Sequence, residues 1–170
     1  MKILGIDSTE LAQKFPLTLR AYRETDREQI FQLFFDTVHS VNAKDYSQKQ
    51  RDVWAEKNTD VSVWCAPLNQ DYTLVAEKNS TVVGFGNIDN RGYLDRLYTH
   101  KDYQGQGIAT KIADALEHHA KKARMPKVIV HASITAKPFF ENRGYIFVCG
   151  NEVKRGDQTL INYKMEKIIK

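Results

Sequence analysis

A glycine-containing loop followed by a long amphipathic helix is the feature that most constrains the fold of this chain. Residues 102–117 have the sequence DYQGQGIATKIADALE. Beyond the glycines, one helix face is lined by apolar residues at helical spacing, namely Ile108, Ile112, Ala115, Leu116 and Ala123. The basic run KKAR places cations at the negative end of the helix dipole, just before Pro126. The pattern predicts a helix from the second glycine to this proline.

Three strands are predicted directly before the loop, over residues 72–77, 82–88 and 93–99. Turn-forming residues separate them at Asn79-Ser80 and at Asn90-Arg91-Gly92. Connections this short join neighbouring antiparallel strands, so the segment predicts an antiparallel meander.

A strand and two helices are predicted before the meander. Apolar and polar residues alternate from Leu17, which is typical of a strand. A first helix should open at Thr25, with Glu28 completing a capping box, and its apolar face comprises Ile30, Leu33, Phe34 and Val38. Ser47 and Gln50 form a second capping pattern, which predicts a shorter helix through Val53 and Trp54.

The last part of the chain predicts a crossover and a hairpin. KVIVHAS is a β-branched run typical of a strand in the middle of a sheet. TAKPFFENRGY predicts a short helix, with Pro138 in its first turn and Gly144 as its end. The two final strands are joined through KRGDQ. The predicted order is β-α-α-β-β-β-α-β-α-β-β, a mixed α/β fold with a mostly antiparallel sheet flanked by helices.

Length and composition predict one soluble domain. The chain has 170 residues, of which 42% are hydrophobic and 27% charged, close to globular averages. Asp7 interrupts the apolar start before it forms a signal-peptide core, and no apolar run is long enough to span a membrane. We therefore expect a cytoplasmic protein that does not bind membranes.

The cysteines and the net charge exclude further classes. Cys65 and Cys149 lie among residues typical of buried strands, which predicts reduced, structural thiols. The net charge of +4 includes no run of five like charges, so a nucleic-acid partner is not expected. The positive excess suits an anionic cofactor, although it serves solubility equally well. No spacing of His and Cys indicates a metal site.

The glycine loop has two interpretations of equal weight when it is taken alone. A strand, a glycine loop and a helix N-terminus together form an anion site, because unpaired amides and the positive end of the helix dipole point the same way. Lys101 and Lys111 would add charge nearby. A tight turn that caps the helix explains the glycines equally well. The dinucleotide fingerprint would need a glycine at Thr110, and the P-loop pattern is absent.

Three motifs in and around the loop favour the anion site over the tight turn. QGQGIA supplies Gln104, Gly107 and Ala109 of a Q/R-x-x-G-x-G/A pattern, LYTHKDY precedes it, and TAKPFFENRGY follows in the late helix. Together with the order of elements they resemble the GNAT superfamily of acetyl-CoA-dependent N-acetyltransferases. The resemblance implies one acetyltransferase domain over residues 1–170, with an N-terminal extension over 1–16 and a core over about 17–166. DYSQKQRDVWA and ASITAKPFFENRGY are similar to a small bacterial subgroup.

The resemblance implies a site for acetyl-CoA between the fourth and fifth strands, which splay apart to admit the pantetheine arm. The backbone of the fourth strand would pair with the pantetheine amides, and the loop would hold the pyrophosphate. The cofactor-binding residues implied in this way are Leu97, Tyr98, Thr99, Gln104, Gly105, Gln106, Gly107, Ile108, Ala109 and Thr110. Backbone near Leu97 would also stabilise the oxyanion of the tetrahedral intermediate.

Proton transfer to and from the reacting groups has several candidates. Asp95 shares a strand face with Leu97 by the period of two, which makes it the expected general base, although a salt bridge to Arg96 or Arg91 explains it equally well. His131 and His39 are weaker candidates, because a single histidine is more often structural.

The position of the family's general acid is occupied by a residue that cannot donate a proton. The tyrosine that the family uses in the late helix falls on Phe140, which leaves Ser133, Tyr145 or water as proton sources. A thiol with a pKa of about 8.5 leaves as thiolate without much help, so transfer remains feasible. A catalytically silent acyl-CoA-binding regulatory module is the alternative that this departure suggests.

The acceptor pocket should lie at the two early helices, where His39, Tyr46 and Trp54 are the expected substrate-contacting residues and Trp64 is a further aromatic. The expected acceptor is the amine of a small molecule or a protein amino group, and the expected state is a monomer or homodimer.

Overall fold

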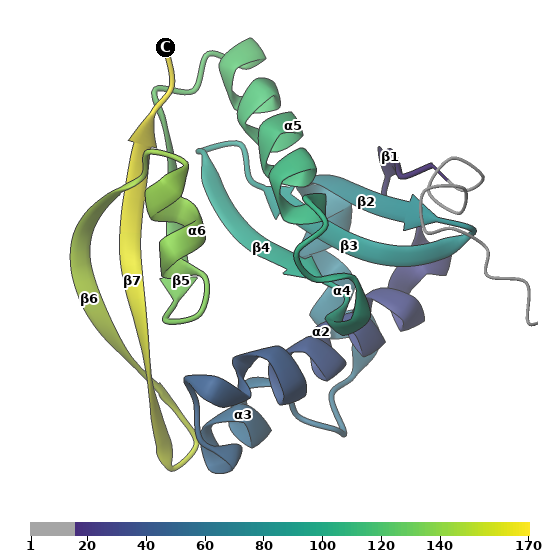
Figure 1. Ribbon diagram of the computed structural model, residues 1–170, viewed down its shortest axis with the longest axis vertical. Helices are drawn as coiled ribbons and strands as arrows, with labels where there is room; N and C mark the ends of the chain where they lie inside the picture. The colour runs from purple at the N-terminus through teal and green to yellow at the C-terminus, as the bar shows by residue number, and fades with distance from the viewer. Residues whose placement is uncertain (1–15) are drawn as a thin grey trace, which may run out of the picture.

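Seven strands form one sheet in the computed structural model, which describes residues 16–170 (Figure 1). In chain order they are β1 (Thr18–Ala21), β2 (Tyr72–Lys78), β3 (Thr81–Ile88), β4 (Tyr93–Thr99), β5 (Lys127–Ser133), β6 (Ile146–Arg155) and β7 (Gln158–Ile168). Their spatial order is β1-β2-β3-β4-β5-β7-β6. Within this sheet β4 and β5 pair in parallel and all other neighbours are antiparallel, which confirms the predicted mixed, mostly antiparallel sheet. The predicted N-terminal extension lies outside the described residues, apart from Pro16.

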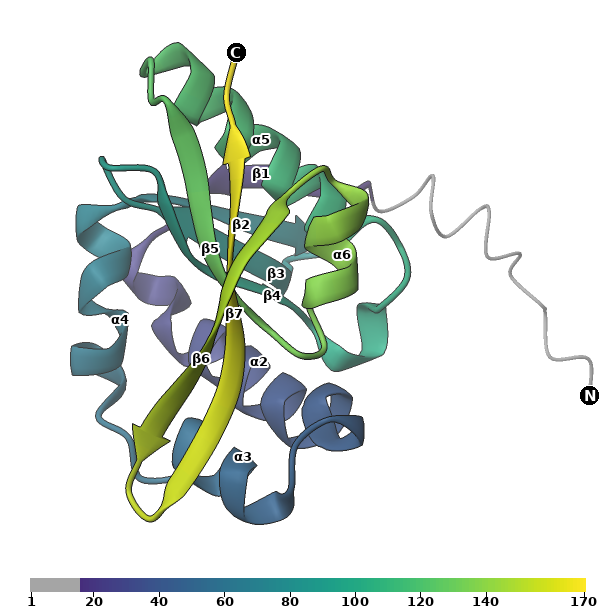
Figure 2. The same cartoon turned by 90° about the vertical axis from the view of Figure 1, so that its left-hand side faces the viewer.

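Helices cover both faces of this sheet (Figures 1 and 2). On one face, α2 (Arg27–Ser40) packs against β3 and β4, and α4 (Val61–Gln70) packs against α2 and β2. On the other face, α5 (Ile108–Lys122) lies across β2, β3 and β4. Two shorter helices, α3 (Gln48–Trp54) and α6 (Lys137–Asn142), contact β7 and β5 respectively. Within residues 16–170, no helix combines the length and the apolar character that crossing a membrane would require.

The sheet separates two apolar cores. The core beneath α5 includes Ile112 and Leu116, and the core on the α2 side includes Phe34 and Phe85. Glycines in β3 let α5 approach closely, since a Cβ at Gly84 would lie only 2.8 Å from the Cγ2 of Ile108. This close packing fixes the start of α5, and with it the glycine loop, against the end of β4.

The β6–β7 hairpin reaches α3, far from it in sequence (Figures 1 and 2). Gln50 Nε2 donates a hydrogen bond to the carbonyl of Thr159, at 2.9 Å. The hydroxyl of Tyr46, just before α3, donates to the carbonyl of Ile161 and accepts from the amide of Ile134, at 2.5 and 2.9 Å. These bonds hold the hairpin against the segment that carries Tyr46 and α3.

The predicted capping box at Ser47 and Gln50 is confirmed, but that at Thr25 and Glu28 is wrong. A short 3-10 turn, Glu24–Asp26, precedes α2, and the Asp26 carboxylate accepts the amide hydrogen of Arg23 at 2.8 Å. Asp26 is buried and ion-paired with Arg20 at 2.8 Å. This pair fixes the first turn, so Asp26 rather than Thr25 is the N-cap, and the helix begins one residue later than the Thr25 pattern indicates.

Two other sequence-based expectations need correction. Helix α4 was not predicted, because it is short and contains Pro67, which removes a helix hydrogen bond. Asp60 begins it by accepting the amide hydrogens of Ser62 and Val63. In α5, Ala123 lies exposed beyond the helix end, and Ala113 and Ala120 occupy the buried face instead.

The cysteines also differ from the expectation. Cys65 is fully buried, but on helix α4 rather than on a strand. Cys149 is on strand β6 as expected, but it is exposed, because β6 is the edge strand and most of its residues face solvent. Both are free thiols.

Candidate functional site

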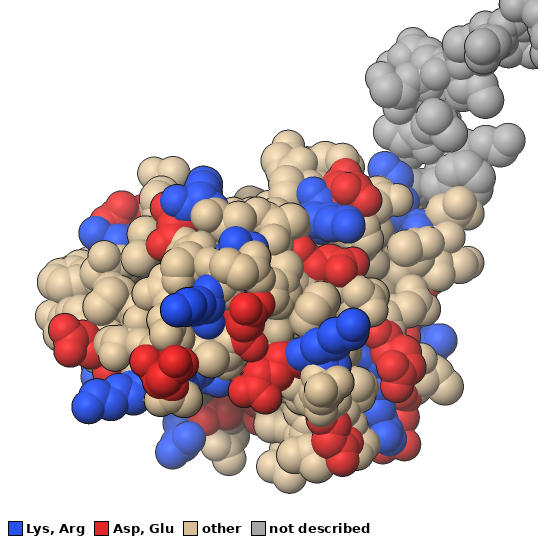
Figure 3. Space-filling model, turned by 90° about the horizontal axis from the view of Figure 1, so that it is seen from below, with Lys and Arg blue, Asp and Glu red and all other residues tan. Residues whose placement is uncertain are grey.

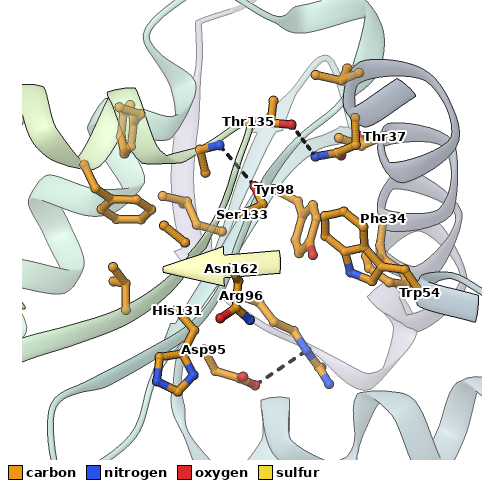
Figure 4. Close-up of a pocket in the computed structure, with 18 of the residues that line it drawn as sticks. Phe34, Thr37, Trp54, Asp95, Arg96, Tyr98, His131, Ser133, Thr135 and Asn162 are labelled. Carbon is orange, nitrogen blue, oxygen red and sulfur yellow. Dashed lines mark hydrogen bonds and ion pairs between the residues drawn. The ribbon is translucent and has the colours of Figure 1, made fainter. Parts of the chain in front are cut away.

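A cavity opens where β4 and β5 separate (Figure 4). The two strands pair only at Tyr93 with Ile129 and at Leu94 with Val130. Beyond these positions β4 stays paired with β3, and β5 stays paired with β7. The gap between them forms part of a cavity of about 600 Å³. Its walls come from α2, α3, α4, α6, both diverging strands and the β6–β7 hairpin.

A β-bulge lies at the point of divergence. In the β3–β4 ladder Asn87 pairs with Arg96 and Ile88 with Leu94, which leaves Asp95 without a partner. Bulges re-aim side chains and interrupt the strand alternation, and they are frequent beside functional sites. The alternation of side chains along β4, which was expected to place Asp95 and Leu97 on one face, is therefore interrupted at Asp95 itself. Both residues nevertheless line the cavity.

Asp95 and His131 lie at the same end of the cavity (Figure 4). The Asp95 carboxylate is 3.6 Å from the Nε of Arg96, and Nδ1 of His131 is 3.4 Å from the hydroxyl of Tyr93. Burial and the charge of Lys164 lower the pKa of His131, while the carboxylate of Asp95 acts in the opposite direction. A lowered pKa keeps the imidazole neutral at neutral pH, so it can accept a proton.

Tyr93 is the hydrogen-bond partner of His131 in this group. Its burial, followed by the nearby charge of Asp95, raises its pKa to about 12. The phenol therefore stays protonated and can act as a hydrogen-bond partner of His131 across the working pH range.

Aromatic rings line the half of the cavity formed by the early helices. The rings of Phe34 and Trp64 stack at 4.6 Å, and Tyr98 meets Phe34 edge-on at 5.1 Å. Trp54 packs edge-on against Tyr46 at 5.0 Å. Burial among these rings raises the pKa of Tyr98. Such a wall suits a flat or apolar group rather than a strongly hydrated one.

The glycine loop lies at the other end of β4. Gly105 and Gly107 have φ values of +70° and +76°, and a Cβ at either position would meet nothing within 4 Å. Within residues 16–170, the amides of residues 104–110 have no protein acceptor. Gln104 turns its side chain inward and donates to the carbonyl of Thr99 at 2.7 Å. The loop thus presents a row of free amides at the N-terminus of α5, as an anion site requires.

The structure brings most of the predicted site residues to this cavity. Its lining includes Tyr46, Trp54, Asp95, Leu97, Tyr98, Thr99, Gln104, Ala109 and Ser133, together with Trp64, His131 and Phe140. Gly105, Gln106, Gly107, Ile108 and Thr110 do not line it; they form the adjoining loop and first turn of α5. The two lysines predicted near the loop, Lys101 and Lys111, are both exposed.

Two predicted residues lie elsewhere. The hydroxyl of Tyr145 donates to Glu117 at 3.0 Å, in a partly buried network with Arg143 and Lys167 outside the cavity. His39 Nε2 lies 2.9 Å from the carbonyl of Ala55, and its ring packs on Phe35. Neither side chain lines the cavity.

Several cavity residues were not singled out from the sequence. Arg96 donates to the carbonyl of Trp64 at 3.0 Å and covers the Trp64 ring, and Arg155 and Asn162 reach the cavity from the β6–β7 hairpin. Two buried oxygens, Thr99 Oγ1 and Asn42 Oδ1, have no partner within residues 16–170. Arg155 and Asn162 could not be predicted, because the β6–β7 hairpin meets the rest of the cavity only in the folded chain.

Charge elsewhere is mixed. On the face seen in Figure 3, basic and acidic side chains are interspersed rather than segregated. Within residues 16–170, no group of three or more His, Cys, Asp or Glu side chains converges as metal ligands.

Comparisons with known proteins agree with this geometry. The family model described as acetyltransferase (GNAT) domain matches residues 42–167. The chain is 30% identical over 150 residues to the uncharacterized N-acetyltransferase YafP of Escherichia coli (strain K12), covering 88% of this chain and 94% of YafP. It is 32% identical to a GCN5-related N-acetyltransferase from Rhodopseudomonas palustris, with a TM-score of 0.85 over 89% of this chain and 94% of that chain.

A more distant structure shares the fold and contains a ligand. The PaiA N-acetyltransferase from Thermoplasma acidophilum, solved in complex with coenzyme A, is 20% identical, with a TM-score of 0.69 over 89% of this chain and 98% of that chain. The family match and the relatives cover most of the sequence, and this chain therefore belongs to the GNAT family of acetyltransferases.

Proposed function

We propose that this acetyltransferase binds acetyl-CoA with the pantetheine arm between β4 and β5 and transfers the acetyl group to an amine held in the aromatic half of the cavity. The single observation that carries the proposal is the loss of pairing beyond Leu94 and Val130. Backbone groups of β4 past this point face an open gap, where an extended pantetheine arm can pair as an added strand. The coenzyme A complex of PaiA supports this choice of co-substrate.

The glycine loop is the proposed site of the pyrophosphate. Within residues 16–170 the amides from Gln104 to Thr110 have no protein acceptor, and they lie at the positive end of the α5 dipole. The positive φ values of Gly105 and Gly107 allow the backbone to curve around an anion without side chains in the way. Lys101 and Lys111 are exposed nearby and add charge.

The chemical step proceeds by direct transfer. The amine nitrogen attacks the thioester carbonyl, the new C–N bond forms, and the C–S bond breaks to release the thiolate of CoA. The nitrogen loses one proton to a base, and the sulfur gains one. Backbone amides of β4 near Leu97 are the proposed donors to the oxyanion, because this segment faces the gap.

His131 is the proposed proton acceptor, and Asp95 stabilises the imidazolium that forms. Asp95 was the expected base, but its carboxylate is ion-paired with Arg96, whereas His131 has a lowered pKa and faces the cavity. If Nδ1 of His131 donates to the Tyr93 hydroxyl, Nε2 is free to receive the proton. Asp95 as the base itself is the alternative that the pH profiles described below distinguish.

Ser133 is the proposed hydrogen-bond donor to the leaving sulfur. Its Oγ accepts the amide hydrogen of Ala136 at 3.0 Å, which leaves the hydroxyl hydrogen available to the cavity. Tyr145 cannot protonate the sulfur, because its hydroxyl donates to Glu117 outside the cavity. The thiolate needs only modest help, because the pKa of an ordinary thiol is about 8.5.

Binding and turnover measurements together test the proposal. At about 100 times its dissociation constant, acetyl-CoA should stabilise the fold by roughly 2.7 kcal/mol, a rise in Tm of about 5–10 °C. Release of CoA thiol should then depend on an added amine. An absent Tm shift would remove the proposed cofactor site. A full shift without turnover of any amine would instead indicate the catalytically silent binding module.

A further inference from the structure

The charged side chains that line the cavity away from the glycine loop are unbalanced. Asp95, Arg96 and Arg155 all line it, so two guanidinium groups stand against one carboxylate. His131 also lines this region and is neutral near pH 7. Such a surface favours a ligand that brings negative charge.

Arg96 is held in a fixed orientation with part of its guanidinium unused. Its Nη1 donates to the carbonyl of Trp64 at 3.0 Å, its Nε lies 3.6 Å from Asp95, and its carbon sits 3.9 Å above the Trp64 ring. Within residues 16–170 its Nη2 has no acceptor. Stacking and the carbonyl bond fix the guanidinium plane, so the unused donors are already oriented.

Arg155 lines the same cavity from the β6–β7 hairpin. It ends strand β6, and within the part of the chain that the structure describes its side chain makes no hydrogen bond or ion pair. Both Arg155 and Arg96 lower the pKa of Tyr98 against the effect of its burial, so both charges act on the same hydroxyl. Arg96, Arg155 and Tyr98 all line the cavity, so two guanidinium groups and a phenol border the same space.

The geometry points to an acceptor that is a small amine carrying a carboxylate beside a flat apolar group, as an α-amino acid with an aromatic side chain does. Arg155 and Arg96 bind the carboxylate, the ring of Trp54 covers the apolar group, and the amine faces the gap near His131. Guanidinium groups bind carboxylates through charge-assisted, often bidentate hydrogen bonds. A polycationic amine would meet repulsion at the same place. This inference rests on the proposed acetyl transfer in this cavity.

Matched acceptor pairs test the inference with the full-length protein. L-Phenylalanine and 2-phenylethylamine differ only in the carboxylate, and spermidine supplies a polycation. We expect kcat/KM to favour phenylalanine over phenylethylamine by roughly tenfold or more, the order of a charge-assisted hydrogen bond in a partly buried site. In Arg155→Gln this preference should shrink through a higher KM for phenylalanine, with the KM for acetyl-CoA unchanged. Arg155→Lys should restore part of it.

Lys154→Gln is the matched control, because Lys154 is the adjacent exposed cation on β6 and does not line the cavity. It should retain the wild-type preference. Equal or better turnover of phenylethylamine or spermidine by the wild type, or an unchanged preference in Arg155→Gln, would overturn the inference.

Product binding gives a second readout that does not need turnover. Trp54 and Trp64, the two tryptophans of the chain, both line the cavity, so intrinsic fluorescence reports on its occupancy. N-acetylphenylalanine, titrated in the presence of CoA, should change this fluorescence in the wild type and bind about tenfold more weakly to Arg155→Gln. Equal affinity in the two proteins, or no binding to either, would contradict the carboxylate site. A failure to bind acetyl-CoA would instead count against the proposed function.

Discussion

Leu94 of β4 and Val130 of β5 are the last residues at which these two strands pair. One residue further on, Asp95 is left out of the β3–β4 ladder as a bulge, and His131 faces the cavity from β5. The end of pairing thus opens the gap that we propose for the cofactor and places two ionisable side chains at its edge. The predictions below test the parts that these residues and the glycine loop are proposed to play.

Replacing His131 by Gln should lower kcat by about 10²–10⁴-fold, the usual contribution of a general base. In the wild type, the acidic limb of kcat/KM should lie below pH 6.5, because the pKa of His131 is lowered by burial and by Lys164. Activity is lost as the pH falls through this pKa, since the protonated imidazole cannot accept a proton. A pH profile with no such limb, together with near-normal kcat in the variant, would exclude His131 as the base.

Asp95→Asn should reduce kcat at saturating acetyl-CoA by about 100-fold or more. The Asp95 charge raises the pKa of His131, so its removal should also move the acidic limb to lower pH. Steady-state profiles of the two variants separate their roles. A limb that persists in His131→Gln but disappears in Asp95→Asn would make Asp95 the base, and activity within a few-fold of wild type would reduce Asp95 to a partner of Arg96.

Ser133→Ala should lower kcat by about tenfold or less, because a thiolate leaves without full protonation. Ser133→Thr keeps the hydroxyl and is the matched control. A loss of kcat above about 10²-fold would mean that Ser133 is an obligatory general acid.

Tyr145→Phe should change stability and leave kcat alone. It removes a partly buried hydrogen bond to the Glu117 carboxylate and should cost about 1–2 kcal/mol of unfolding free energy. Denaturant unfolding and steady-state kinetics on the same preparation measure both effects. A large fall in kcat with little loss of stability would show that Tyr145 takes part in proton transfer after all.

Gly107→Ala should weaken acetyl-CoA binding by about tenfold or more. Its φ of +76° is unfavourable for alanine, so the loop should relax and turn its amides away from the pyrophosphate. Gly144→Ala is the matched control, with a φ of +86°, an equally empty surrounding and a position at the end of α6. Both variants should lose about 1–2 kcal/mol of stability, but only the first should bind acetyl-CoA more weakly by calorimetry. Equal affinities would remove the loop from the binding site.

Thiol labelling should distinguish the two cysteines. Cys149 is exposed and should react rapidly with a disulfide reagent, whereas Cys65 is fully buried and its pKa is raised by burial. We expect one fast and one slow equivalent in native protein and two fast equivalents in denaturant. Two fast thiols in the native state would contradict the packing of α4.

Local patterns made much of the fold predictable. The alternation in the meander and the apolar face of α5 each depend on neighbouring residues, and both appear as predicted apart from Ala123. The helix around Cys65 was missed because Pro67 and the valines before it weaken any local helix signal. The exposure of Cys149 depends on β6 being the edge strand, which no local pattern encodes.

The candidate site also contains some residues that could be predicted from the sequence and others that could not. The glycine loop and the end of β4 are contiguous in sequence, so their residues could be named in advance. Arg155 and Asn162 enter the cavity only because the β6–β7 hairpin folds back onto α3 through bonds such as that from Tyr46 to Ile161. The bulge at Asp95 could not be predicted because it depends on the register with β3. Tyr145 lies outside the cavity because it bonds to Glu117, which is distant in sequence.

The most direct test of acetyl transfer in the β4–β5 gap is mass spectrometry of a reaction that contains the protein, acetyl-CoA and phenylalanine. We predict N-acetylphenylalanine in an amount equal to the CoA thiol released, with both formed about 10²-fold or more slowly in His131→Gln. Acetyl-CoA that binds and stays intact with phenylalanine and with every other amine supplied would contradict acetyl transfer at this site.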